Sequence, residues 1–123
     1  MPTLLGVILL GGAGAAARYA VERYFSRGDS VFPWATILVN VGGSFLVGVL
    51  FVVATERLDL APWIRTSLLA GLVGGLTTFS AFSLQTFRLI EQGSISLAAA
   101  NVAVSVGAGL AAVALGIGVA RVI

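Results

Sequence analysis

Hydroxyl and amide side chains stand inside long apolar stretches of this sequence of 123 residues. Such groups cost free energy in an apolar medium unless they find a hydrogen-bonding partner, so they indicate either helix contacts or a site. None of them is a carboxylate, and together they offer N–H and O–H donors without fixed negative charge. This donor set is suited to binding an anion. Its members are Asn40, Thr77, Thr78, Ser80, Ser83, Thr86, Asn101 and Ser105.

Each of these residues also has a purely structural interpretation. A Ser or Thr hydroxyl in an apolar helix usually bonds the carbonyl four residues earlier. Asn40 and Asn101 can hold neighbouring helices together, which is worth about 0.6–2 kcal/mol for each contact. Asn101 and Ser105 are four residues apart, so they share one face of a helix.

Two phenylalanines accompany the densest group of hydroxyls. Phe79 and Phe82 are three residues apart and therefore share a helix face. Aromatic rings have a positive edge, which can contact a small, hard anion weakly enough to release it, as conduction requires. From spacing alone, packing or contact with lipid is the more usual role of two phenylalanines in a membrane helix.

The segment GLVGGLTTFSAF, at 71–82, contains three glycines in an otherwise lipid-like stretch. Glycine lowers helix stability by about 1 kcal/mol relative to alanine. The sequence therefore predicts a helix that is closely packed, or broken near 74–78, where it would line a site. Small residues four apart also indicate close helix packing. These pairs are Gly11/Ala15, Ser44/Gly48, Gly71/Gly75 and Gly107/Ala111.

The composition is that of an integral membrane protein. Hydrophobic residues make up 59%, the mean hydropathy is +1.07, and charged residues make up 10%, against about 25% in soluble domains. Cysteine and histidine are absent, so disulfides and imidazole chemistry are excluded. The net charge of +2 suits contact with anionic lipid headgroups and does not indicate a nucleic-acid partner.

Uncharged runs at 1–17, 30–55, 66–87 and 92–120 predict four membrane-spanning helices in one domain. We expect them at about 2–24, 33–55, 62–91 and 94–121. The first becomes long enough by continuing past Arg18, whose side chain would reach the interface or face protein. We expect this segment to be retained as a helix and not cleaved as a signal peptide, because a basic n-region is lacking.

Arginines are nearly balanced between the two sides of this expected topology. Three of them fall on the side of the N-terminus, and four fall on the other side, so the positive-inside rule gives little orientation preference. We therefore expect the chain to insert both ways, unless one arginine outweighs the others. The first set is Arg57, Arg65 and Arg121, and the second is Arg18, Arg23, Arg27 and Arg88.

GLVGGLTTFSAF, together with ATILVNVGGSFLVG at 35–48 and GGAGAAARY at 11–19, resembles the Fluc (CrcB) family of fluoride channels over the whole chain. The resemblance implies an all-α membrane protein: an antiparallel, dual-topology homodimer whose subunits have four transmembrane helices with a break in helix 3. It implies passive, fluoride-selective export from the cytoplasm across the inner (plasma) membrane, protecting the cell from fluoride toxicity, and no enzyme activity.

The resemblance also assigns roles to individual residues. Phe79 and Phe82 match the paired phenylalanines that line the fluoride path, and Asn40 matches the asparagine beside it. Gly74 and Thr77 match positions whose backbone carbonyls, from both subunits, hold a central structural sodium ion. Two further matches are Ser105, to a hydroxyl of the polar track in helix 4, and Arg18, to an arginine near a vestibule.

Two positions depart from the family pattern. Ala81 replaces a common threonine, and Gly109 stands where a hydroxyl is expected, and both changes affect the outer polar track.

Two other functions compete with this one. A small multidrug-type cation/proton transporter is also a dual-topology dimer of four-helix chains, but it needs an ionisable carboxylate inside the membrane. Here Glu22, Glu56 and Glu91 all fall at expected helix ends. A non-conducting assembly subunit would explain the glycines as packing residues and would leave the clustered Thr, Ser and Phe unexplained.

Overall fold

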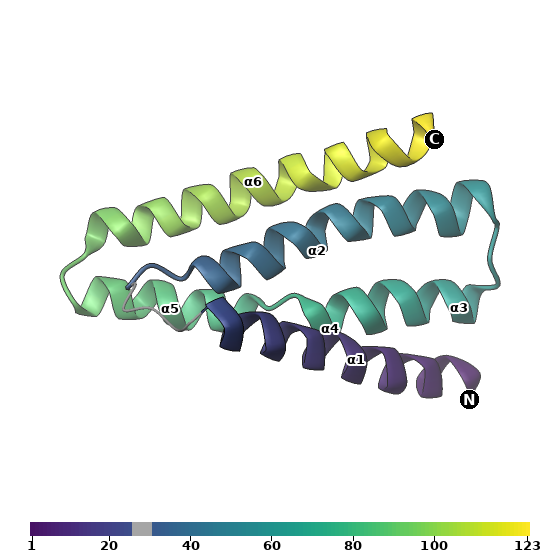
Figure 1. The fold of residues 1–123 in the computed structure, drawn as a ribbon, viewed down its shortest axis with the longest axis horizontal. Helices are drawn as coiled ribbons and strands as arrows, with labels where there is room; N and C mark the ends of the chain where they lie inside the picture. The colour runs from purple at the N-terminus through teal and green to yellow at the C-terminus, as the bar shows by residue number, and fades with distance from the viewer. Residues whose placement is uncertain (26–30) are drawn as a thin grey trace.

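The computed structural model describes residues 1–25 and 31–123, and every regular element within them is a helix (Figure 1). Arg27, and residue 30 at the start of the second uncharged run, lie outside these ranges. Two short π-helical turns, η1 and η2, extend or interrupt the α-helices. The elements are α1 (Pro2–Phe25), α2 (Trp34–Val52), η1 (Val53–Arg57), α3 (Pro62–Thr66), η2 (Ser67–Val73), α4 (Gly74–Leu76), α5 (Phe79–Glu91) and α6 (Ile95–Val122).

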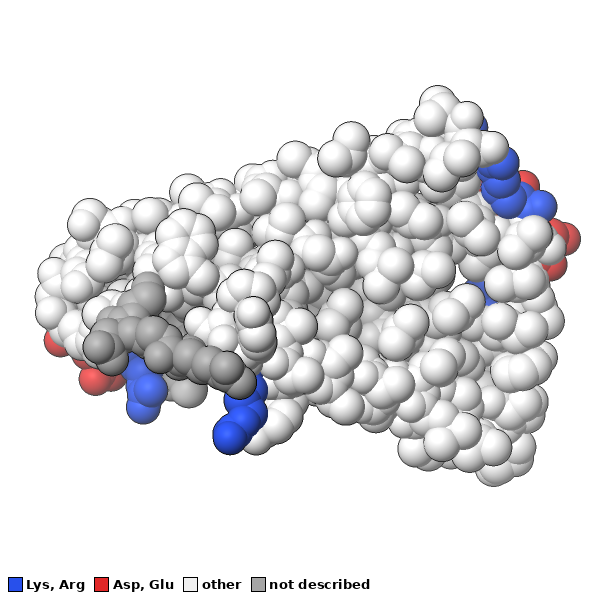
Figure 2. Space-filling view, viewed as in Figure 1, with Lys and Arg blue, Asp and Glu red and all other residues white. Residues whose placement is uncertain are grey.

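Four helical segments in the described part of the chain are long and apolar enough to cross a membrane. Their ends differ by at most two residues from the predicted ends. On the face shown in Figure 2, charged side chains gather toward the two ends of the molecule, and the middle carries almost none. The protein is therefore a multi-pass membrane protein. The four segments are Pro2–Phe25, Trp34–Arg57, Pro62–Glu91 and Ile95–Val122.

Residues with special backbone properties lie at the helix ends. Pro33 occupies the N-cap of α2, and Pro62 is the first residue of α3, where a missing N–H costs nothing. Gly93 has φ +79 after the end of α5, which is the left-handed conformation that favours glycine. Ser94 is the N-cap residue of α6, although its hydroxyl makes no capping hydrogen bond.

Glycines set the spacing within two pairs of helices that lie side by side in Figure 1. In the first pair, a Cβ on Gly48 of α2 would meet the α6 backbone at Gly116. In the second pair, a Cβ on Gly75 of α4 would lie 3.1 Å from the Cα of Gly11 in α1. These contacts confirm close packing at one member of each of three predicted small-residue pairs, Gly11/Ala15, Ser44/Gly48 and Gly71/Gly75. A Cβ on Gly107 of α6, by contrast, would meet nothing within 4 Å.

Two residues without helical backbone separate α4 from α5 in the third spanning segment. Thr77 has φ −89 and ψ 156, and Thr78 has φ −149 and ψ 120, so both have extended backbone. Helix α4 ends at Leu76 and α5 begins at Phe79, so these two residues fall inside or next to the region 74–78 that the sequence marks. The part before these threonines packs against α1, and the part after them packs mainly against α6.

Candidate functional site

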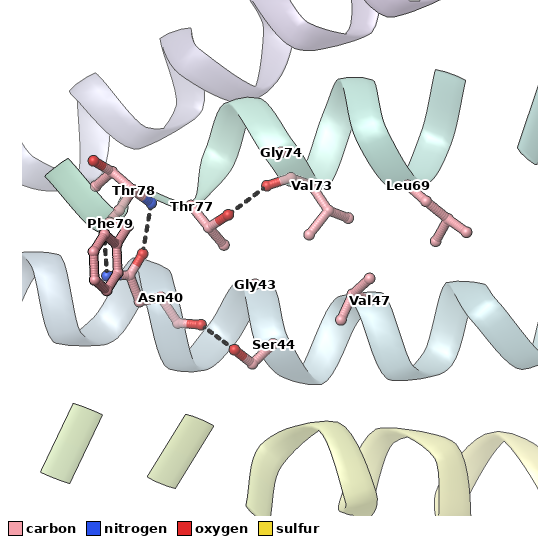
Figure 3. A pocket seen from close by; sticks show the side chains of 10 residues that line it. All are labelled: Asn40, Gly43, Ser44, Val47, Leu69, Val73, Gly74, Thr77, Thr78 and Phe79. Atoms are coloured by element: carbon pink, nitrogen blue, oxygen red, sulfur yellow. Dashed lines mark hydrogen bonds between the residues drawn. The ribbon is translucent and has the colours of Figure 1, made fainter. Parts of the chain in front are cut away.

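The amide group of Asn40 pairs with the backbone of Thr78. Asn40 Nδ2 donates to the Thr78 carbonyl at 2.9 Å, and the Thr78 N–H donates to Asn40 Oδ1 at 2.7 Å (Figure 3). These bonds satisfy two backbone groups that have no partner within the helix, in a region where water is scarce. The Thr78 hydroxyl in turn caps α5 by accepting from the N–H of Ala81 at 3.2 Å.

Carbonyl oxygens remain unpaired around the same two threonines. The Val73 carbonyl accepts from both the N–H and the hydroxyl of Thr77, each at 3.0 Å. Among the described residues, the carbonyls of Gly74 and Thr77 accept no hydrogen bond. In a continuous helix they would accept from the N–H groups of Thr78 and Ala81, but these donate to Asn40 and to the Thr78 hydroxyl. Unpaired carbonyl oxygens at this depth suit a hard cation or water.

An open groove of about 400 Å³ runs between α2 and the third spanning segment. Its polar side chains are those of Asn40, Ser44, Thr77 and Thr78, and glycines, aliphatic side chains and the Phe79 ring form the rest of the wall (Figure 3). No carboxylate lines it. The lining residues are Asn40, Gly43, Ser44, Val47, Leu69, Val73, Gly74, Thr77, Thr78 and Phe79.

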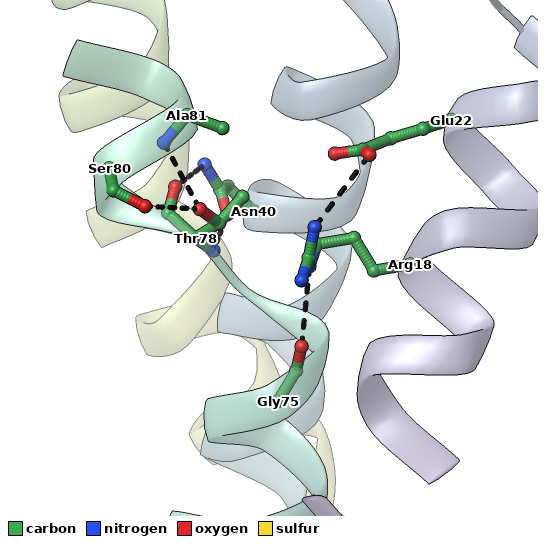
Figure 4. Close-up of polar contacts among 7 residues, drawn as sticks. All are labelled: Arg18, Glu22, Asn40, Gly75, Thr78, Ser80 and Ala81. Atoms are coloured by element: carbon green, nitrogen blue, oxygen red, sulfur yellow. Dashed lines mark hydrogen bonds and ion pairs between the residues drawn. The ribbon is translucent and has the colours of Figure 1, made fainter. Parts of the chain in front are cut away.

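The two predicted pathway phenylalanines lie together at the start of α5. The ring centroids of Phe79 and Phe82 are 5.6 Å apart, and the rings are tilted by 46°. Phe79 also lines the groove and is 78% exposed, although it is a large apolar side chain in the middle of a spanning segment. Ser80 lies beside it, with its Oγ 3.4 Å from the Thr78 hydroxyl (Figure 4).

Arg18 approaches the same region from α1. Its Nε donates to the Gly75 carbonyl at 3.4 Å, and its Nη1 lies 3.7 Å from a carboxylate oxygen of Glu22 (Figure 4). The guanidinium therefore satisfies one of the carbonyls at the end of α4 and adds positive charge close to the threonines. Its side chain is 29% exposed.

Asn101 and Ser105 belong to a second cluster, between α5 and α6. Asn101 is fully buried, and its Nδ2 donates to the Thr86 hydroxyl at 2.8 Å. Thr86 donates to the Phe82 carbonyl at 2.7 Å, and Ser105 donates to Asn101 Oδ1 at 3.3 Å. Phe82 links this cluster to the first, because its carbonyl accepts from Thr86 and its ring lies beside Phe79. Ser83 is exposed on α5 and has no side-chain hydrogen bond among the described residues.

Two polar residues near these clusters were not predicted as site residues. Ser44 lines the groove and donates to the Asn40 carbonyl at 2.7 Å, and its position four residues after Asn40 is the signal that could have found it. Gln85 lines a separate cavity of about 250 Å³, where its buried Oε1 has no partner among the described residues. A polar side chain inside an apolar run is the signal for Gln85.

Comparison with known proteins identifies the family. The family model described as CrcB-like protein, Camphor Resistance (CrcB), matches residues 5–117. The chain is 49% identical over 105 residues to a fluoride-specific ion channel FluC of Coxiella burnetii, covering 81% of this chain and 83% of that protein.

Two further relatives carry the same name. The chain is 44% identical over 106 residues to the protein of Rhodospirillum centenum, covering 85% of this chain and 84% of that protein. It is 39% identical over 107 residues to the protein of Citrifermentans bemidjiense, covering 86% of each. With a family model spanning most of its length and relatives of this similarity, the chain belongs to the CrcB family.

Proposed function

We propose that this protein is a fluoride-selective ion channel that exports fluoride passively from the cytoplasm and so protects the cell from fluoride toxicity. The relatives at up to 49% identity are named fluoride-specific ion channels. The observation that carries the proposal is the wall of donors and ring edges around Asn40, Thr78 and Phe79, which contains no carboxylate.

In this proposal the anion path follows α5 and the adjoining faces of α2 and α6. Ring edges of Phe79 and Phe82 offer weak positive contacts that let a fluoride ion move on. Asn40 uses one N–H for Thr78 and retains a second one for an anion. Arg18 attracts anions electrostatically. The proposed pathway residues are Arg18, Asn40, Thr78, Phe79, Ser80, Phe82, Ser83, Asn101 and Ser105.

The working unit in this proposal is an antiparallel homodimer in the inner membrane, with the two subunits inserted in opposite orientations. Support comes from the groove, which is open on one side, and from Phe79, which is 78% exposed beside unpaired carbonyls. A second subunit would cover both. The antiparallel arrangement would also bring the extended threonines of both chains to the same depth.

A sodium ion at the centre of the dimer fits the residues present. The carbonyls of Gly74 and Thr77 are unpaired within the described chain, and hard cations take oxygen ligands. No carboxylate adds charge there, which is consistent with a monovalent ion. When bound, sodium would supply positive charge that holds the two subunits together and favours a nearby anion.

The small multidrug-type transporter is the less supported alternative. Proton-coupled cation exchange needs an available carboxylate at membrane depth. Glu22 lies near the end of α1 beside Arg18, and Glu56 lies in η1 with Arg121 at 2.7 Å. Glu91 is the last residue of α5.

Anion efflux from liposomes tests the proposal. Purified protein is reconstituted in vesicles loaded with potassium fluoride or potassium chloride, and efflux is started with a potassium ionophore. We expect rapid fluoride efflux and far slower chloride efflux, without fluoride-coupled proton uptake. Equal rates for the two anions would refute selectivity, and obligatory proton uptake would indicate an antiporter.

A further inference from the structure

Helix α5 is held to the rest of the subunit at few points. The extended residues Thr77 and Thr78 connect it to α4, so no continuous helix fixes its rotation about its own axis. It packs mainly against α6, and its outward side chains Leu84 and Phe87 are each 57% exposed. Something other than extensive packing must therefore define which way Phe79 and Phe82 face.

One face of α5 is turned inward and carries a polar anchor. Phe82, Thr86 and Leu89 follow one another at helical spacing, and Leu89 is only 2% exposed. Within the described chain, the bond from Asn101 to Thr86 is the only side-chain hydrogen bond between α5 and α6. Asn101 is fully buried, so the bond is shielded from competing water.

The anchor is connected directly to the backbone that carries the ring. The Thr86 hydroxyl accepts from Asn101 and donates to the Phe82 carbonyl at 2.7 Å. On the other side, Ser105 donates to Asn101 Oδ1, which fixes the orientation of the amide. The chain of bonds thus runs from Ser105 on α6 to the residue whose ring lies against Phe79.

We propose that Thr86 is a positioning residue: its bond to Asn101 locks the rotation of α5 and thereby sets the orientation of the Phe82 ring. This inference rests on the proposed function in one respect: the orientation of the Phe82 ring affects efflux because fluoride passes along that ring. Thr86 itself needs no contact with the anion. Rotation of α5 by a few tens of degrees would carry both rings away from their present position.

Three substitutions test the positioning role of Thr86 by fluoride efflux. Thr86→Val keeps the shape of the side chain and removes the hydroxyl, and we expect efflux to fall about tenfold, the factor that one net hydrogen bond represents. Thr86→Ser retains the hydroxyl and should restore efflux to near the wild-type rate. Thr55→Val is the matched control, since Thr55 also donates to the carbonyl four residues earlier, that of Phe51, and anchors no other helix.

The orientation of the ring is measured independently of conduction. Para-fluorophenylalanine is incorporated at position 82, and the fluorine NMR spectrum is recorded for the full chain in detergent or nanodiscs. Wild type, Thr86→Ser and Thr55→Val should each give one narrow resonance. Thr86→Val should give a shifted or additional resonance, as expected for more than one rotation of α5.

These two readouts separate the inference from the proposed function. If the wild type passes no fluoride, the proposed function fails and the spectrum alone decides whether Thr86 positions the ring. If the wild type conducts, either a wild-type spectrum or wild-type efflux in Thr86→Val overturns the inference. If Thr86→Val does not fold, the fluorine spectrum of Thr86→Val combined with Asn101→Leu decides the inference, because replacing both partners with apolar groups of similar shape costs little stability. Efflux is not used for this variant, since Asn101 belongs to the proposed pathway.

Discussion

Asn40 and Thr78 are 38 residues apart in the sequence and face each other through two hydrogen bonds, at 2.9 and 2.7 Å. The side-chain amide of Asn40 pairs with the N–H and the carbonyl of Thr78 in the manner of a neighbouring β-strand. This single side chain replaces the helical bonds that the extended residue lacks. The groove wall depends on it, because Thr78 also caps α5.

Asn40→Leu should destabilise the subunit. It leaves both backbone groups of Thr78 unpaired, and we expect the free energy of unfolding to fall by about 2 kcal/mol. Ser44→Ala is the control, since its hydroxyl bonds only the carbonyl of its own helix at Asn40. Unfolding by denaturant titration in detergent gives both values, and equal stability of the two variants would contradict the role of the amide.

Phe82→Ile should reduce fluoride efflux while the protein remains folded and its oligomeric state is unchanged. The aliphatic side chain fills similar space and has no positive ring edge. Phe87→Ile, at an outward position that is 57% exposed, should leave efflux close to the wild-type rate. Undiminished efflux in Phe82→Ile would restrict that ring to a packing role.

Gly75→Ala should loosen the contact between α4 and α1. The added Cβ would lie 3.1 Å from the Gly11 Cα, and backbone atoms cannot yield as a flexible side chain does. Overpacking of this kind costs about 1–3 kcal/mol. Gly12→Ala is the matched change, because a Cβ there meets nothing within 4 Å, and it should leave stability unchanged or slightly higher. The same unfolding titration measures whether the free energy of unfolding falls in Gly75→Ala and is unchanged or higher in Gly12→Ala.

Replacing sodium with a large organic cation during purification should weaken the proposed dimer. The expected ligands are backbone carbonyls of Gly74 and Thr77, which supply no charge to substitute for the ion. Size-exclusion chromatography and fluoride efflux, before and after sodium is restored, measure the effect. If prolonged exchange changes neither, the sodium proposal loses its support.

A single cysteine introduced after Met1 should reveal both orientations. Among the described arginines, three fall on each side of the expected topology: Arg57, Arg65 and Arg121 on one, and Arg18, Arg23 and Arg88 on the other. An impermeant thiol reagent should label about half of the protein in intact cells, with the remainder accessible after permeabilisation. Labelling that is complete or absent in intact cells would contradict dual topology. The unmodified chain contains no cysteine, so it provides the background.

The helices were predictable because hydrophobic runs and the residues at their ends are local properties. Pro33 and Pro62 lie at helix starts and Gly93 follows a helix end, where the backbone preferences of proline and glycine favour them. Family resemblance and composition also identified the correct family. These signals need no knowledge of which helices are neighbours.

Partners across the fold were not predictable from the same signals. Asn40 and Asn101 look alike in the sequence, as amides within apolar runs, yet one pairs with the backbone of Thr78 and the other with the side chain of Thr86. Likewise Gly48 packs on α6 while Gly107 faces open space. Which neighbour a helix face meets is decided by tertiary packing and leaves no local pattern.

The change of neighbour at Thr77 and Thr78 has a consequence for the order of assembly during synthesis. Helix α5 has 13 residues and is about 20 Å long, shorter than the roughly 30 Å of hydrocarbon that a lone helix must cross. Its main partner, α6, follows it in the chain. The second half of the third span therefore reaches its final place only after the fourth helix has been inserted. Until then Thr86 lacks its hydrogen bond from Asn101, and a chain truncated before Ile95 would never form it.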